Sequence, residues 1–151
     1  MYYKDMSPYS NSKVQWRRWT WRPRPKMVNI GWLSDGCQFI PSFDNYRWLP
    51  TLVDLCKYRF NATLGTFCCP FCDVGTQDVS GYTIEAINEK TLFLGNAEIW
   101  IPANQDLVLV APNLIVHYIN RHGYRPPQTF DAALEKVSSA DVEQLKLSVV
   151  N

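Results

Sequence analysis

Histidine is scarce in this 151-residue sequence, which contains only His117 and His122. A catalytic Ser-His-Asp triad or Cys-His pair would have to use one of these two side chains. A zinc deaminase would need a His-x-Glu element and a Pro-Cys-x-x-Cys element. Here proline lies inside the Cys pair, and no histidine precedes it. The sequence therefore favours a protein that is not an enzyme.

Long apolar runs are also missing. No run reaches the roughly 18 residues that a membrane-spanning helix needs. The first residues are polar and aromatic, unlike the apolar core of a secretory signal. We therefore expect a cytoplasmic protein that does not associate with membranes. The sequence has no internal repeat or low-complexity tract, and its length favours one domain with modest extensions.

The net charge of +1 hides an uneven distribution, because basic residues crowd the first segment while the rest of the chain is acidic. Residues 1–27 lack helical periodicity and are predicted to form an extended basic arm, strand-like from Val14 to Trp21. Arginine and tryptophan alternate there and can stack through cation–π contacts, so the arm either docks on the body or stays disordered. The residues predicted to bind a partner are Trp16, Arg17, Arg18, Trp19, Trp21 and Arg22.

Two cysteines and the two histidines form the most informative pattern. Cys69 and Cys72 belong to a Cys-Pro-Phe-Cys turn, and His117 and His122 follow with a spacing found in zinc fingers. Two thiolates and two imidazoles complete a tetrahedral zinc site, and four protein ligands leave no position for a catalytic water. The sequence therefore predicts a structural zinc site made of these four residues.

The other three cysteines leave alternatives open. Cys68 could replace Cys69, although its spacing to Cys72 is less common, and Cys37 or Cys56 could replace a histidine. Without a metal, the paired cysteines would be buried thiols and the histidines would be ordinary helix-end residues. In a reducing compartment we expect metal ligands and free thiols rather than disulfides.

The apolar pattern predicts an α+β fold, a small antiparallel β-meander with helices. Helices are expected over 49–58, from Pro112 to His122, from about Thr129, and in a last segment capped by Ser139. Strands are expected over 82–87, 91–94, 97–101 and 107–110. The order of Cys-x-x-Cys knuckle, hairpin and His-bearing helix is that of a ββα zinc finger with an enlarged hairpin region. We place the basic arm at 1–27, a zinc-stapled domain at 28–138 and an amphipathic tail at 139–151.

Several short motifs outside the arm are distinctive. They are Leu33-Ser34-Asp35-Gly36, Leu55-Cys56, Asn61-x-Thr63-x-Gly65, Cys69-Pro70-Phe71-Cys72, Leu94-Gly95-Asn96-Ala97-Glu98-Ile99, Ala111-Pro112-Asn113-Leu114-Ile115-x-His117-Tyr118 and His122-Gly123-Tyr124-Arg125-Pro126-Pro127. With these motifs the sequence resembles an uncharacterised bacterial family of small domains of unknown function, over about Gly31 to Val137. The resemblance implies one compact domain and the Cys-Cys-His-His set, and it implies no activity. Within these motifs we expect Glu98 to pair with Arg121 or Arg125.

Three classes of function compete. Trp, Tyr and Arg often concentrate binding energy, so a zinc-bound body with this arm favours a module that binds a protein partner, such as an accessory or immunity-type bacterial protein. Nucleic-acid binding by the arm is the alternative, although the acidic balance of the body argues against it. A metalloenzyme is the least favoured class. The sequence predicts neither the identity of the partner nor the oligomeric state.

Overall fold

The computed structural model describes residues 1–11, 13–18, 23–73 and 80–150. Its elements are β1 (Gln15–Trp16), β2 (Lys26–Asn29), α1 (Leu49–Leu55), β3 (Thr83–Ile87), β4 (Lys90–Leu94), β5 (Glu98–Asn104), β6 (Leu107–Pro112), α2 (Ile115–His122), α3 (Gln128–Lys136), α4 (Ser139–Ser148) and β7 (Val149–Val150). The fold class is α+β, as the apolar pattern predicted. None of the described helices is long and apolar enough to cross a membrane.

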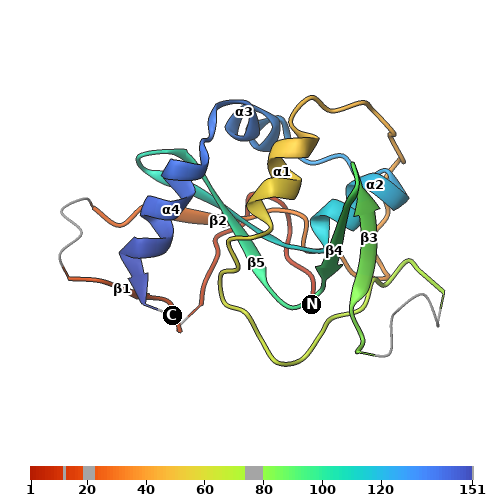
Figure 1. Cartoon of the computed structure of the whole chain (residues 1–151), viewed down its shortest axis with the longest axis horizontal. Coiled ribbons are helices and arrows are strands. Elements are labelled where there is room, and N and C mark those ends of the chain that lie inside the picture. The colour runs from red at the N-terminus through yellow and green to blue at the C-terminus, as the bar shows by residue number, and fades with distance from the viewer. Residues whose placement is uncertain (12, 19–22, 74–79, 151) are drawn as a thin grey trace.

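The strands form three small sheets rather than one meander (Figure 1). β5 and β6 make the predicted antiparallel hairpin, and β2 joins β6 in parallel in a central sheet of order β2-β6-β5. β3 and β4 make a second antiparallel hairpin that forms its own sheet. Gly95, with φ +113°, turns the chain away after β4, so β4 does not continue into β5 as a neighbouring strand. The antiparallel hairpins are thus confirmed, and the single meander is wrong.

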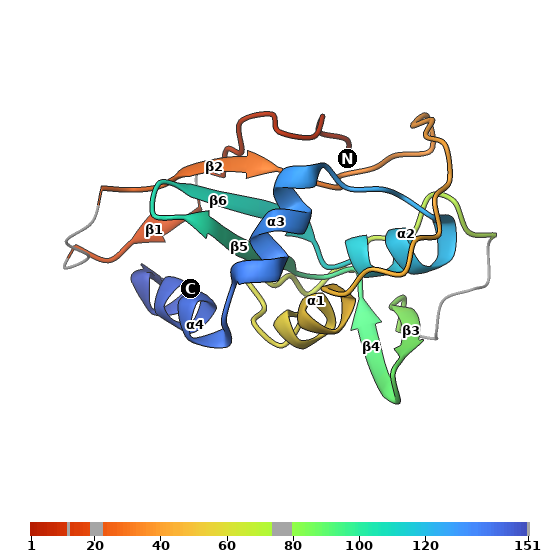
Figure 2. The ribbon, with the colours of Figure 1, turned by 90° about the horizontal axis from the view of Figure 1, so that it is seen from above.

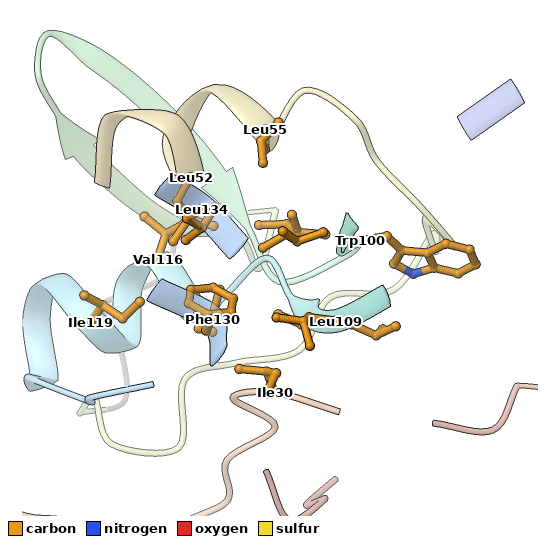
Figure 3. Packing of buried hydrophobic residues seen from close by; sticks show 14 of the residues in the cluster. Ile30, Leu52, Leu55, Trp100, Leu109, Val116, Ile119, Phe130 and Leu134 are labelled. Atoms are coloured by element: carbon orange, nitrogen blue, oxygen red, sulfur yellow. The ribbon is translucent and has the colours of Figure 1, made fainter. Parts of the chain in front are cut away.

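The core lies between the central sheet and the helices. In Figure 2, α3 and α4 lie beside β5, and the β3–β4 hairpin projects away from the central sheet. The largest fully buried side chains include Leu52 of α1, Leu109 of β6, Ile115 of α2 and Phe130 of α3. Figure 3 shows Leu52, Leu109 and Phe130 among the labelled side chains of the core. α2 ends at Gly123, which has φ +67° and serves as the predicted left-handed C-cap.

The described part of the arm is docked on the body. β1 pairs with β7, so that Trp16 lies opposite Val149. The Trp16 ring also lies 6.4 Å from that of Trp100 in the central sheet. Tyr9 donates a hydrogen bond of 2.9 Å to the Glu98 carboxylate. These contacts favour docking over disorder for this part of the arm. The division at residues 27 and 138 stays an interpretation.

Ser138 is the N-cap of α4, one residue before the predicted Ser139. Its Oγ accepts the Asp141 N–H at 3.2 Å, and the Asp141 carboxylate accepts the Ser138 N–H at 2.9 Å. The prediction of Ser139 was wrong because the capping box needs an acidic residue three positions after the cap, and that residue is Asp141. Val142, with 0% exposure, docks the helix on the core.

Replacing Ser138 by Ala should lower the free energy of unfolding by about 1 kcal/mol, because the Asp141 N–H in the first turn of α4 loses its acceptor. Urea denaturation of the two variants Ser138→Ala and Ser139→Ala measures this directly. Ser139→Ala is the matched control and should change stability little. Equal losses in the two variants would contradict the assignment of the cap.

Candidate metal centre

Cys69, Cys72, His117 and His122 come together, and their ligand atoms all lie within 4.8 Å of one another. Cys72 Sγ lies 3.2 Å from His117 Nε2 and 3.3 Å from His122 Nε2. Cys69 Sγ lies 3.3 Å from His122 Nε2, and the two Nε2 atoms are 3.2 Å apart. Ligand atoms around a tetrahedral zinc ion lie about 3.3–3.8 Å apart, given Zn–N of about 2.0 Å and Zn–S of about 2.3 Å. Small shifts would therefore let these four residues hold a metal ion.

The cysteine turn is positioned by contacts at both ends. The Phe67 N–H donates to Gly95 O at 2.7 Å. A Cβ on Gly95 would lie 2.5 Å from Phe67 O, so only glycine allows this approach. Beyond the first cysteine, the Phe71 ring packs 5.8 Å from the Tyr118 ring of α2. The Phe71 N–H also donates to Cys69 Sγ at 3.4 Å, which is the kind of backbone support a thiolate ligand needs.

Glu85 of β3 orients His117. Glu85 Oε2 accepts the His117 Nδ1–H at 2.7 Å, while Oε1 accepts hydrogen bonds from Asn120 Nδ2 at 2.5 Å and Arg121 Nε at 3.0 Å. A proton on Nδ1 leaves the Nε2 lone pair pointing at the cysteines, as a metal ligand requires. Burial alone would raise the pKa of Glu85, but the hydrogen bonds from His117, Asn120 and Arg121 lower it. The carboxylate therefore stays charged.

The role of Glu85 was missed by the sequence interpretation. Residues 82–87 were expected to form a half-buried strand, and the buried face of β3 carries Thr83, Glu85 and Ile87. Glu85 is 0% exposed, whereas its apolar neighbour Ile84 is 41% exposed. Glu85 is flanked by Ile84 and Ala86, so the local pattern places it on the exposed face and gives no signal of its burial. A buried carboxylate is rare unless it is paired, and its partners come from α2.

The pKa values of Cys69 and His122 also bear on metal binding. Burial raises the pKa of the Cys69 thiol to about 11. Burial and the neighbouring His117 lower the pKa of His122, so this imidazole is held neutral. A bound metal cation stabilises the thiolate form and uses the neutral imidazole, releasing thiol protons as it binds.

The three remaining cysteines lie outside the cluster among the described residues. The Cys37 thiol accepts the Ser34 N–H at 3.3 Å, the Cys56 thiol donates to Leu52 O at 3.5 Å, and Cys68 is exposed. The alternatives in which one of them replaces a ligand therefore receive no geometric support.

The prediction that Glu98 pairs with Arg121 or Arg125 is wrong. Arg121 pairs with Glu85, and Arg125 pairs with Asp44 at 2.9 Å and with Asp131. Glu85 takes Arg121 because β3 lies beside the last turn of α2, which carries Arg121, whereas Glu98 faces the docked arm.

The structure describes some of the predicted partner-binding residues and leaves others outside the described part. Trp16 is partly buried against the core, and Arg17 and Arg18 are exposed. Trp19, Trp21 and Arg22 lie outside the described residues. Their role in binding a partner stays a prediction.

The fold and the site define a small α+β domain with a Cys2His2 cluster able to hold a metal ion. The chain belongs to the family called Domain of unknown function (DUF7919), whose model matches residues 1–135. The resemblance noted in the sequence thus leads to a family of unknown function, and the match extends to the arm, which the resemblance had left out. No curated protein and no solved structure gives a significant match.

Replacing Glu85 by Gln should weaken metal binding about 10–100-fold, because the carboxylate that orients a histidine ligand loses its charge. Competition with a chromophoric chelator measures the affinity. Glu89→Gln, in the exposed β3–β4 turn, is the matched control and should keep the affinity of the original chain. If both variants bind metal equally, Glu85 does not support the site.

Proposed function

We propose that the cluster is a structural zinc site and that the chain is a non-catalytic protein-interaction module. The observation that carries the zinc assignment is the convergence of two sulfur and two nitrogen ligand atoms within 4.8 Å. Zinc prefers tetrahedral sites of this composition, and sites with four protein ligands are structural because substrate or water has no open position.

The ion would join parts of the chain that are distant in sequence. The cysteine turn, the β3–β4 hairpin with Glu85, and α2 with both histidines together form the unit that we propose as an enlarged ββα finger. The β5–β6 hairpin is inserted between the second and third parts. Metal binding would then hold the long segment 56–82, which contains no described helix or strand, against α2.

The metal content of the purified chain tests the first half of the proposal. We expect one zinc ion per chain by elemental analysis, retained through dialysis and released by a strong chelator. Purification from medium supplied equally with zinc, iron and nickel should still yield zinc. A metal-free chain with an unchanged melting curve would contradict the proposal.

The interaction role is supported by the proposed set of four ligands, which would leave no open position for chemistry at the metal, and by the exposed Arg17 and Arg18 beside the docked Trp16. A reducing cytoplasm would suit a protein with two thiolate ligands. Nucleic acid remains the alternative partner. Trp16 is poorly placed to stack on bases, because it packs toward Trp100.

Affinity capture with the full chain tests the interaction role better than removal of the arm, because a shortened chain would also lose the bond from Tyr9 to Glu98. The variant carrying Arg17→Glu and Arg18→Glu should lose the captured protein, and Lys136→Glu on α3 is the control. Oligonucleotide titrations across salt should show no binding. A steep salt dependence would favour nucleic acid and contradict the proposal.

A further inference from the structure

A cavity lies beside the metal centre and is not part of it. It has a volume of about 270 Å³ and opens between the loop after β2, the segment before the cysteine turn and the β4–β5 junction. Cys68 and Pro70 of the cysteine turn and Tyr118 of α2 form one side. Ligand cavities usually span about 300–1,000 Å³. This cavity therefore suits a small molecule or a single side chain.

The walls of the cavity are partly aromatic. Trp32, Phe67 and Tyr118 line it. Trp32 is fixed in place, because its Nε1–H donates to Val110 O at 3.1 Å. Phe67 is 55% exposed, so its ring is available at the mouth. Aromatic faces attract organic cations through the charge distribution of their rings.

The charge of the lining is negative. Asp35 and Glu98 are its charged side chains, Met1 with its amino group also lines it, and no lysine or arginine lines the cavity in the described part of the chain. Glu98 Oε2 accepts hydrogen bonds from Asn61 at 2.8 Å, Trp100 at 2.8 Å and Tyr9 at 2.9 Å. From the residues that the structure describes, Oε1 accepts only the longer bond from Tyr9, at 3.1 Å. Because an ionised carboxylate has about four acceptor positions, Oε1 keeps capacity for a donor.

No described cation neutralises Glu98, since the ion pairs of the described residues involve other carboxylates. Burial raises the pKa of Glu98, and the hydrogen bonds from Trp100, Tyr9 and Asn61 offset that effect only in part. A cation beside this partly buried carboxylate would favour its charged form.

Asn96 adds a buried acceptor on the same lining. It is 3% exposed, and its Nδ2 donates to the Tyr82 hydroxyl at 3.0 Å, which fixes the orientation of the amide. Its Oδ1 has no hydrogen-bond partner among the described residues. The Oδ1 atom is itself enclosed, so a ligand in the cavity would reach it only after a turn of the amide.

We propose that this cavity binds an organic cation, an amine or guanidinium on a short apolar stem. The N–H groups of the cation meet Glu98 and Asp35, and the stem lies against Trp32 and Phe67. The cation comes either from a small molecule or from a lysine or arginine side chain of a protein. The inference goes beyond the proposed function, because it requires neither a partner of the arm nor a particular metal.

Titration calorimetry of the metal-loaded full chain tests the proposal. The probes are agmatine, a short peptide with a central arginine, and the same peptide with citrulline, which keeps the shape without the charge. At least one cationic probe should bind about tenfold or more tightly than the citrulline peptide, as charged hydrogen bonds require. Binding of agmatine would indicate a small-molecule site, and binding of the arginine peptide alone would indicate a protein side chain.

Two variants locate the binding. Glu98→Gln should weaken cation binding about tenfold or more. Asp35→Asn should weaken it about two- to fivefold, because Asp35 is exposed to solvent. Asp35 lies in an exposed turn, so its variant keeps the fold even if Glu98→Gln does not. Asp106→Asn, in the distant β5–β6 turn, is the control. Equal binding of arginine and citrulline peptides, no binding of either cation, or no effect of Asp35→Asn would overturn the proposal.

Discussion

Cys72→Ser should release the metal and cause the largest loss of stability of any single substitution in this chain. Cys72 Sγ lies within 3.3 Å of the Nε2 atoms of His117 and His122. The substitution therefore removes the ligand that lies next to both histidines. Structural zinc contributes on the order of 10 kcal/mol to small fingers, against a total stability of about 5–15 kcal/mol for a typical domain.

The chain also has an apolar core. We therefore expect Cys72→Ser to lower the free energy of unfolding without unfolding the chain completely. A loss of about 5 kcal/mol would lower the melting temperature by roughly 10–20 °C. Calorimetry of Cys72→Ser beside Cys68→Ser, an exposed thiol outside the cluster, measures the difference. Chelation of the original chain should reproduce the effect, and a Cys72→Ser chain that melts like Cys68→Ser would contradict the site.

Phe130→Ala should cause the second largest loss, about 3–5 kcal/mol, through the cavity that it leaves in the core. Phe130 of α3 is 0% exposed, and its ring lies edge-on to Trp48, with centroids 5.6 Å apart. Through this contact it connects the segment before α1 to α3, the helix that packs on β5. Figure 3 shows Phe130 among the labelled core side chains.

Urea denaturation of Phe130→Ala, with Phe43→Ala as the control, tests this expectation. Phe43 is 68% exposed and should contribute little. The Phe130 variant should also bind metal as the original chain does, because the substitution is not in the cluster. Comparable stability of the two variants would mean that the core is not organised around α3.

The elements that the sequence predicted correctly depend on local signals. α2 is an example, since an apolar face leads to Gly123, whose left-handed cap ends the helix at the expected residue. The set of Cys69, Cys72, His117 and His122 also follows from spacing, because metal ligands must belong to the few residue types that bind metal. The structure brings these four together.

The features that the sequence did not predict depend on contacts between distant segments. β2 pairs in parallel with β6, far along the chain, and no local pattern specifies such a partner. Glu85 could not be assigned because the choice of buried face in β3 depends on the hydrogen bonds from α2, which outweigh the apolar preference of Ile84. The docking of Trp16 likewise requires β7 and Trp100.

X-ray absorption spectroscopy at the zinc edge of the purified, metal-loaded chain tests the central claim most directly. We predict two sulfur atoms at about 2.3 Å and two nitrogen atoms at about 2.0 Å, with no oxygen ligand. His122→Ala should replace one nitrogen by a water oxygen, while Cys37→Ser should leave the spectrum unchanged. A first shell of oxygen atoms, or one with fewer than two sulfurs, would contradict the account.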